Sequence, residues 1–152
     1  MDLTEEPLED LNRRWAELLQ ELRVAQTGVQ ILAGFLLMVP FSAAFDSLDQ
    51  PRKAAYVAVL LGAVAATVLL LSPVALHRAL FGRGQRAWLI VAAHHLSRVG
   101  LLLLGAANVG AVWFVADFVL GAGLAQMIAA VLLALIVLLW AILPMGIHAQ
   151  SR

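Results

Sequence analysis

The stretch Leu18 to Leu37, LLQELRVAQTGVQILAGFLL, decides the fold of this chain, because a charged amphipathic pattern changes within it into a membrane-like one. Before and into this stretch, apolar residues recur three and four apart, the spacing of one helix face; they are Leu8, Leu11, Trp15, Leu18 and Leu22. No charged residue occurs over 24–45, which exceeds the ~20 residues that a membrane span needs. The stretch therefore predicts an amphipathic helix at 4–23 that leads directly into a first span at 24–45.

The composition places the whole chain in a membrane. Hydrophobic residues make up 62% of the 152 residues and charged ones 13%, against about 25% charged in an ordinary soluble domain. The formal net charge is zero, so no basic footprint for a nucleic-acid partner is present. The absence of cysteine excludes disulfides, thiolate metal sites and cysteine nucleophiles. We expect a single membrane domain over 1–152 with membrane lipids as its surroundings.

Three further apolar segments follow the first span. They predict spans at about 54–76, 99–119 and 124–143, joined by a polar turn at 46–53, a basic loop around Arg83 and a glycine turn at 121–123. Pro40 predicts a kink near the end of the first span, since proline removes one helical hydrogen bond. A continuous helix over 87–120 would be about 50 Å long, so part of it must lie outside the hydrocarbon core. The fold class is therefore an all-α integral-membrane four-helix bundle with an amphipathic N-terminal helix.

The distribution of basic residues predicts the orientation. Eight of the ten Lys and Arg residues fall on the side of the chain termini, and only Arg52 and Lys53 fall on the other. We expect a protein of the bacterial inner membrane, and under the positive-inside rule this bias places both of its termini in the cytoplasm.

A second helical face carries polar or small residues from the amphipathic part into the first span. These residues, here called the polar strip, are Gln20, Arg23, Thr27, Gln30 and Gly34. Gln30 lies far enough along the span to be below the headgroups, where an amide exposed to lipid is costly. We therefore expect the polar strip to face other helices or a hydrated cavity.

Polar residues predicted near the same depth, with Asn108 further into the membrane, complete a candidate vestibule at the cytoplasmic interface. The candidate residues are Glu21, Arg23, Thr27, Gln30, His77, His94, Arg98 and Asn108. One interpretation is an ion-handling site, because a histidine can exchange protons near neutral pH and a glutamate can attract cations. The other is that these side chains anchor helix ends at the headgroups and satisfy one another across the bundle.

The sequence contains no recognisable catalytic or metal-binding set. The central parts of the four predicted spans hold no Asp, Glu, Lys, Arg or His, although a proton-coupled carrier usually keeps an ionisable group there. Asp46 and Asp117 fall toward span ends and are interpreted as boundary residues. His94 and His95 are adjacent, so on a helix they point about 100° apart, and no HxxxH pair occurs. We expect no metal, no cofactor and no enzymatic activity.

Several motifs resemble those of a known family. The segments ELLQELRVAQTGVQIL (17–32), FLLMVPF, SPVALHRALF and VADFVLG resemble a family of small four-helix membrane proteins of unknown function from GC-rich Gram-positive bacteria. Members of that family are sometimes labelled sodium/proton antiporters. The resemblance covers most of the chain and brings no established catalytic or binding residues with it.

Two functional hypotheses follow. The first is ion or proton permeation, as a channel or in sodium/proton transport, through a homo-oligomer with the polar strip at its cytoplasmic mouth. The second is a non-catalytic structural or accessory protein. Its amphipathic helix would lie on the lipid surface or dock a protein partner, including the same helix of another subunit.

Overall fold

The computed structural model describes residues 6–80 and 86–142, and this part of the chain is almost entirely helical. The elements are α1 (Glu6–Met38), η1 (Val39–Phe41), α2 (Ala43–Asp46), α3 (Gln50–Leu80), α4 (Arg86–Leu120), α5 (Ala122–Val137) and the π-helical turn η2 (Leu138–Ile142). No strand occurs within the described residues. The predicted all-α class is confirmed for them.

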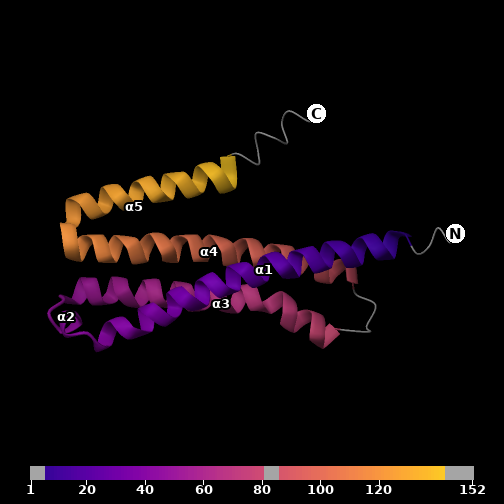
Figure 1. Ribbon diagram of the computed structural model, residues 1–152, viewed down its shortest axis with the longest axis horizontal. Helices are drawn as coiled ribbons and strands as arrows, with labels where there is room; N and C mark the ends of the chain where they lie inside the picture. The colour runs from indigo at the N-terminus through magenta and orange to yellow at the C-terminus, as the bar shows by residue number, and fades with distance from the viewer. Residues whose placement is uncertain (1–5, 81–85, 143–152) are drawn as a thin grey trace.

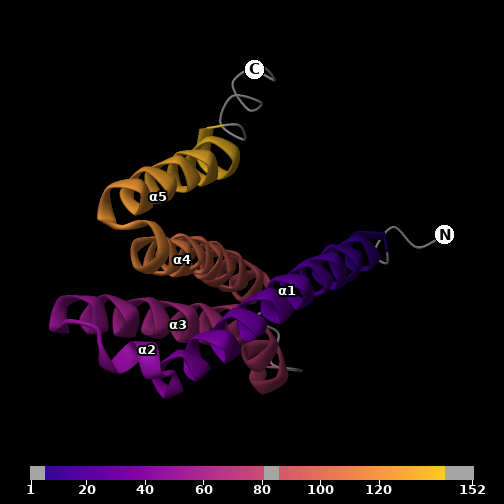
Figure 2. The same ribbon diagram turned by 60° about the vertical axis from the view of Figure 1, so that its left-hand side comes forward.

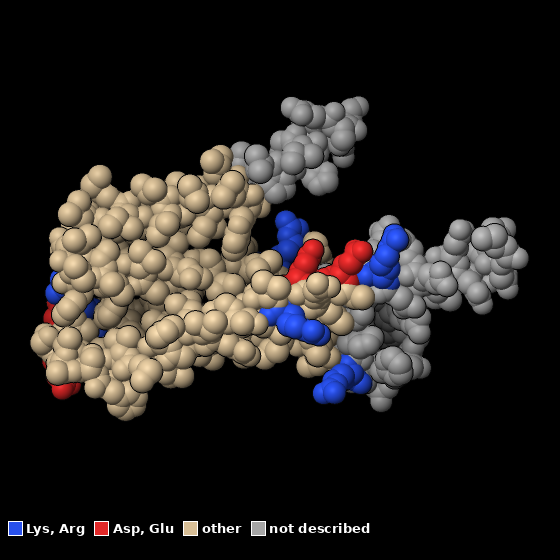
Figure 3. All heavy atoms as spheres, in the orientation of Figure 1, with Lys and Arg blue, Asp and Glu red and all other residues tan. Residues whose placement is uncertain are grey.

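Four of these helices are long and apolar enough to cross a membrane. The candidate spans are Leu19–Phe41, Gln50–Leu76, Val91–Leu120 and Ala122–Trp140. Acidic and basic side chains gather at the two ends of the molecule, and the band between them is free of charge on the face seen in Figure 3. We refer to the end that carries α2 as the α2 end and to the other, where α1 begins and α5 finishes, as the opposite end (Figure 1).

The amphipathic segment and the first span form one unbroken helix, α1, of 33 residues. The predicted helix start at Thr4 lies outside the described residues. At the other end α1 stops at Met38, and Pro40 lies in the short 3-10 turn η1. The predicted kink is therefore the end of the helix, because Pro40 has no N–H to continue the hydrogen-bond ladder. Ser42 follows with extended backbone angles and hydrogen bonds back to the carbonyl oxygen of Val39.

Helices α3 and α4 form the central pair of the fold. Small side chains that are buried on these two helices allow a close approach; they are Ala63, Ala66, Ala93 and Ala107. Gly110 of α4 lies so near α3 that a Cβ added there would be 2.6 Å from a methyl carbon of Val59. Pro73 is fully buried inside α3, and the helix changes direction in its second half (Figure 1).

The two outer helices lie on separate sides of the central pair. Helix α1 packs mainly on α3, through a core that includes Leu22, Val29 and Leu36, whereas α5 packs on α4. Figures 1 and 2 both show α1 and α5 apart, so one face of α4 is left between them. Gly121 makes the tight turn from α4 to α5, and its φ of +84° is a backbone conformation that favours glycine. Pro144, predicted to close the last span, lies outside the described residues.

Candidate functional site

Within one copy of the protein, the polar strip lies on a face of α1 that none of the other described helices covers. The buried side of α1 carries Leu22, Val29 and Leu36, which belong to the core. All five residues of the polar strip are exposed: Gln20, Arg23, Thr27, Gln30 and Gly34. The strip therefore faces outward, away from α3 and α4.

The polar strip has few contacts of its own. The Thr27 hydroxyl donates to the Arg23 carbonyl oxygen one turn back, at 3.0 Å. The Gln30 side chain makes no hydrogen bond to any part of the chain that the structure describes. A Cβ built on Gly34 would meet no atom within 4 Å. Beyond Gly34 the same face becomes apolar, with Leu37 and Phe41 exposed, so the strip ends about two thirds of the way along the span.

The other vestibule candidates do not assemble with the polar strip in one copy. Glu21, His94, Arg98 and Asn108 are exposed, and the side chain of His77 lies outside the described part of the chain. Among the side chains that are described, these candidates share no hydrogen bond or ion pair with one another. The rings of His94 and His95 lie 6.3 Å apart at 73°. No group of three His, Asp or Glu residues that could hold a metal ion occurs within the described ranges.

Gln26, which the sequence analysis did not single out, forms a hydrogen bond between helices. Its side-chain nitrogen donates to the carbonyl oxygen of Leu70 in α3, at 2.9 Å. Pro73 interrupts the hydrogen-bond ladder of α3 at this turn, because it cannot donate to the carbonyl of Leu69. Gln26 thus places its amide against the backbone beside the proline.

Tyr56 of α3 makes another hydrogen bond to a backbone carbonyl near a proline, here Pro40. Its hydroxyl donates to the carbonyl oxygen of Leu36, at 2.5 Å, and the tyrosine side chain is buried. Leu36 lies four residues before Pro40, so its carbonyl is the one that the proline leaves without a helical donor. The Tyr56 ring also packs against Phe45, edge to face at 5.1 Å between centroids, and against Phe114. Pro40 is the signal in the sequence from which the Leu36 carbonyl can be found. The carbonyl that Pro73 leaves without a donor is that of Leu69, one residue before the Leu70 carbonyl that Gln26 binds.

The α2 end is closed by charged residues. The Arg52 side chain donates to Asp117 of α4 at 2.6 Å, and only 5% of the Asp117 side chain is exposed. Asp49 accepts a hydrogen bond from the backbone N–H of Arg52 and so caps the first turn of α3. Asp117, interpreted from sequence as a boundary residue, is thus a buried carboxylate whose ion pair joins α3 to α4.

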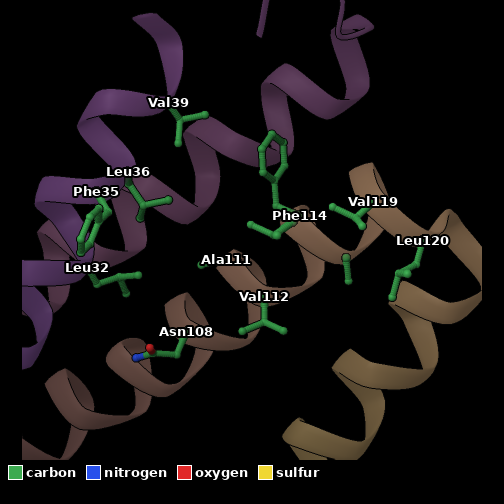
Figure 4. A pocket seen from close by; sticks show the side chains of 12 residues that line it. Leu32, Phe35, Leu36, Val39, Asn108, Ala111, Val112, Phe114, Val119 and Leu120 are labelled. Atoms are coloured by element: carbon green, nitrogen blue, oxygen red, sulfur yellow. The ribbon is translucent and has the colours of Figure 1, made fainter. Parts of the chain in front are cut away.

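An apolar groove of about 560 Å³ runs between α1 and α4 (Figure 4). Its lining residues on α1 are Leu32, Phe35 and Leu36, with Val39 of η1; those on α4 are Asn108, Ala111, Val112, Phe114, Val115, Ala116, Val119 and Leu120. Asn108 is the one amide in this lining, and its nitrogen donates to the carbonyl oxygen of Leu104 in its own helix, at 2.9 Å. The oxygen of that amide accepts no hydrogen bond from the described residues.

In the part of the chain that the structure describes, these features define a small α-helical protein with four helices able to span a membrane. Its interhelical contacts use backbone carbonyls, small residues and an ion pair whose carboxylate is buried. A family model matches residues 4–144, and the chain belongs to that family, which is described as a family of unknown function (DUF6328). No curated protein matches the chain. No solved structure matches it either.

Proposed function

We propose that this protein is a non-catalytic accessory protein of the bacterial inner membrane, which docks a protein partner through the N-terminal part of α1. The observation that supports this proposal is the continuity of α1, which runs from Glu6 to Met38 although its candidate span begins only at Leu19. The 13 residues before the span extend the helix by about 20 Å beyond the apolar segment. A partner bound there would be connected rigidly to the membrane-embedded helices.

The extension carries charged side chains on its described surface. Arg13 and Glu17 are exposed and lie 4.0 Å apart, one helical turn from each other. Exposed pairs of this kind contribute little to stability, so this pair gives the extension a charged surface and adds little to the folding of the helix. The apolar stripe of the same helix, predicted from Leu8 and Leu11, supplies the second element of a docking face.

Deletion of residues 1–15 tests the proposal. Proteins crosslinked to the full chain in intact cells are identified, and the deletion is expected to abolish recovery of the specific partner while the helical content of the membrane domain is retained. A control replaces residues 1–15 with Gly and Ser of equal length, and it should fail as the deletion does, because a flexible tail cannot present a helical face. Recovery of the same partners with both variants would refute the docking role.

Ion or proton permeation through a homo-oligomer is the second candidate function. It is favoured by the outward position of the polar strip, because the strips of several copies could meet around an axis and line a hydrated path. Purified protein in liposomes, under an imposed sodium, potassium or proton gradient, should then show a flux that Gln30→Leu reduces. A flux equal to that of empty liposomes would count against permeation and leave the accessory proposal standing.

We also propose that the opposite end, where α1 begins, faces the cytoplasm. The basic residues Arg13, Arg23, Arg78 and Arg98 are exposed, and the chain predicts an excess of positive charge on that side. Because the chain contains no cysteine, single variants can report sidedness directly. In intact cells a membrane-impermeant thiol reagent should label Ser47→Cys, at the α2 end, and leave Glu17→Cys unlabelled; the reverse pattern would invert the topology.

A further inference from the structure

Two side-chain amides are left exposed at the middle of the candidate spans. Gln30 of α1 has no hydrogen-bond partner among the described residues, and Asn108 of α4 has only the Leu104 carbonyl of its own helix. Both residues are exposed. Lipid tails offer neither donors nor acceptors, so an amide that faces them carries a free-energy cost that a polar partner removes.

The two amides lie at the same depth. Gln30 is 11 residues before Phe41 and Asn108 is 12 residues before Leu120, the residues that end their candidate spans near the α2 end. At 1.5 Å per residue these separations are about 17 and 18 Å. The groove also indicates that the two amides lie at similar depths. Leu32, only half a turn beyond Gln30, lines the groove together with Asn108.

Gln30 and Asn108 of the same copy cannot meet. Gln30 and Leu32 are two residues apart, about 200° around the helix axis, so they lie on nearly opposite faces of α1. Leu32 faces the groove that contains Asn108, and Gln30 faces away from it. A contact between the two amides therefore requires two copies of the chain.

We propose that the polar strip of one copy docks into the groove of the next copy, with Gln30 hydrogen-bonded to Asn108 across the interface. This inference rests on the homo-oligomer that the sequence predicts and specifies how its subunits meet; it does not depend on permeation. Each amide has a donor and an acceptor to offer, so one contact satisfies both residues.

The surfaces on either side of the two amides also match. Gly34, one turn beyond Gln30, has open space around it and lets a second helix approach closely. Further toward the α2 end the same face of α1 exposes Leu37 and Phe41, and the groove beyond Asn108 is lined by apolar side chains such as Val112 and Val115. The polar side chains of the two surfaces thus meet at mid-depth, and their apolar side chains meet on the side nearer the α2 end.

The contact uses two different surfaces of each copy, so it is heterologous. A heterologous contact repeated around an axis closes into a ring when the rotation permits. In such a ring the mid-depth part of the polar strip is buried in the interface between subunits and does not line water. This arrangement therefore differs from a pore that the polar strip lines.

Crosslinking between two single-cysteine variants tests the interface. The chain contains no cysteine of its own, so each variant carries a single reactive thiol. Gln30→Cys and Asn108→Cys are made in separately tagged copies, co-expressed, and treated in native membranes with a short bifunctional methanethiosulfonate. This reagent is needed because hydrogen-bonded amides hold their Cβ atoms further apart than the ~4 Å of a disulfide. We expect a crosslinked dimer that carries both tags. The matched control, Ile31→Cys with Asn108→Cys, should give none, because Ile31 is also exposed but points about 100° away from Gln30.

Other outcomes overturn the proposal in distinguishable ways. A product from Gln30→Cys alone would indicate pairing of like surfaces. Rapid labelling of Gln30→Cys by a charged thiol reagent would indicate that the polar strip lines water. The oligomeric state of the unaltered protein is measured independently by mass photometry in nanodiscs: a monomer there refutes the oligomer itself, whereas an oligomer without the mixed product refutes only this interface.

A second measurement does not depend on cysteine chemistry. Gln30→Leu and Asn108→Leu should each raise the dissociation constant of the oligomer about three- to thirty-fold, the range for one hydrogen bond within a membrane. The double variant should cost no more than either single change, because both remove the same contact. Strictly additive effects would contradict a direct bond between the two amides.

Discussion

The hydroxyl of Tyr56 donates its proton to the carbonyl oxygen of Leu36, the carbonyl that Pro40 deprives of its helical donor. The bond joins α3 to the last turn of α1 and is buried between Phe45 and Phe114. In a bilayer an unpaired carbonyl has no water to bind, so a proline is tolerated where a neighbouring helix supplies the missing donor. Tyr56 of α3 thus supplies the hydrogen-bond donor that Pro40 removes from the end of α1.

Tyr56→Phe tests this arrangement. The phenyl ring keeps the packing and removes only the donor, so we expect a loss of about 1 kcal/mol in the free energy of unfolding. In the Pro40→Ala background the loss should be smaller, because residue 40 then supplies an N–H that can reach the Leu36 carbonyl. Detergent unfolding of the four proteins of this double-mutant cycle measures the difference. Equal losses in both backgrounds would show that Tyr56 and Pro40 act independently.

Gln26 and Gln30 form a matched pair, one helical turn apart on α1. Gln26→Leu removes the donor to the Leu70 carbonyl, so it should destabilise the monomer in detergent by about 0.5–2 kcal/mol. Gln30→Leu removes no bond within the described part of the chain and should leave monomer stability unchanged or slightly increased. Thermal unfolding under monomeric conditions compares them. A larger loss for Gln30→Leu would contradict the assignment of Gln26 as the interhelical donor.

The contrast between these two glutamines shows how far the sequence alone can go. Long uncharged apolar runs predict helical spans because a membrane leaves few alternatives for the backbone, and α1, α3, α4 and α5 each contain a segment long and apolar enough to span. The rotation of each helix about its axis is set instead by packing with its neighbours. Leu22, Val29 and Leu36 repeat every seven residues on the buried side of α1, and Gln26 falls between them. That repeat was the available signal for which glutamine faces inward.

The sequence predicts which residue types of the candidate vestibule lie at which depth, but it does not predict which of their side chains contact one another. Within one copy Asn108 lines the groove between α1 and α4, and Gln30 lies on the face of α1 that points away from this groove. Contacts between distant segments, such as Arg52 with Asp117, depend on which helices are neighbours. Hydropathy and spacing along the chain carry no information about that pairing.

The buried carboxylate of Asp117 makes a third prediction. Arg52→Ala leaves this carboxylate without its cation in a position where only 5% of the side chain is exposed, so the protein should unfold at a clearly lower temperature. Asp117→Asn combined with Arg52→Ala should recover much of that loss, because the buried charge is then absent. Lys53→Ala is the control, since Lys53 is the neighbouring basic residue and makes no ion pair with Asp117; its ammonium donates to the exposed Asp46 carbonyl at 3.4 Å and lies 5.7 Å from the centre of the Phe45 ring. An equal effect of Lys53→Ala would refute a specific role for the ion pair.

Gly110 and Gly62 provide the last prediction, because the same substitution should act in opposite directions. In a helix Gly→Ala is favourable by up to about 1 kcal/mol, and Gly62→Ala should show a gain since its Cβ would meet no atom within 4 Å. At Gly110 the added Cβ would lie 2.6 Å from Val59, so Gly110→Ala should separate α3 from α4 and cost about 1–3 kcal/mol. Val59→Ala in the same chain should relieve part of this cost by removing the methyl groups in the way. Unfolding of the three variants in detergent measures these changes, and a stabilising Gly110→Ala would show that the close approach of α3 and α4 does not depend on this glycine.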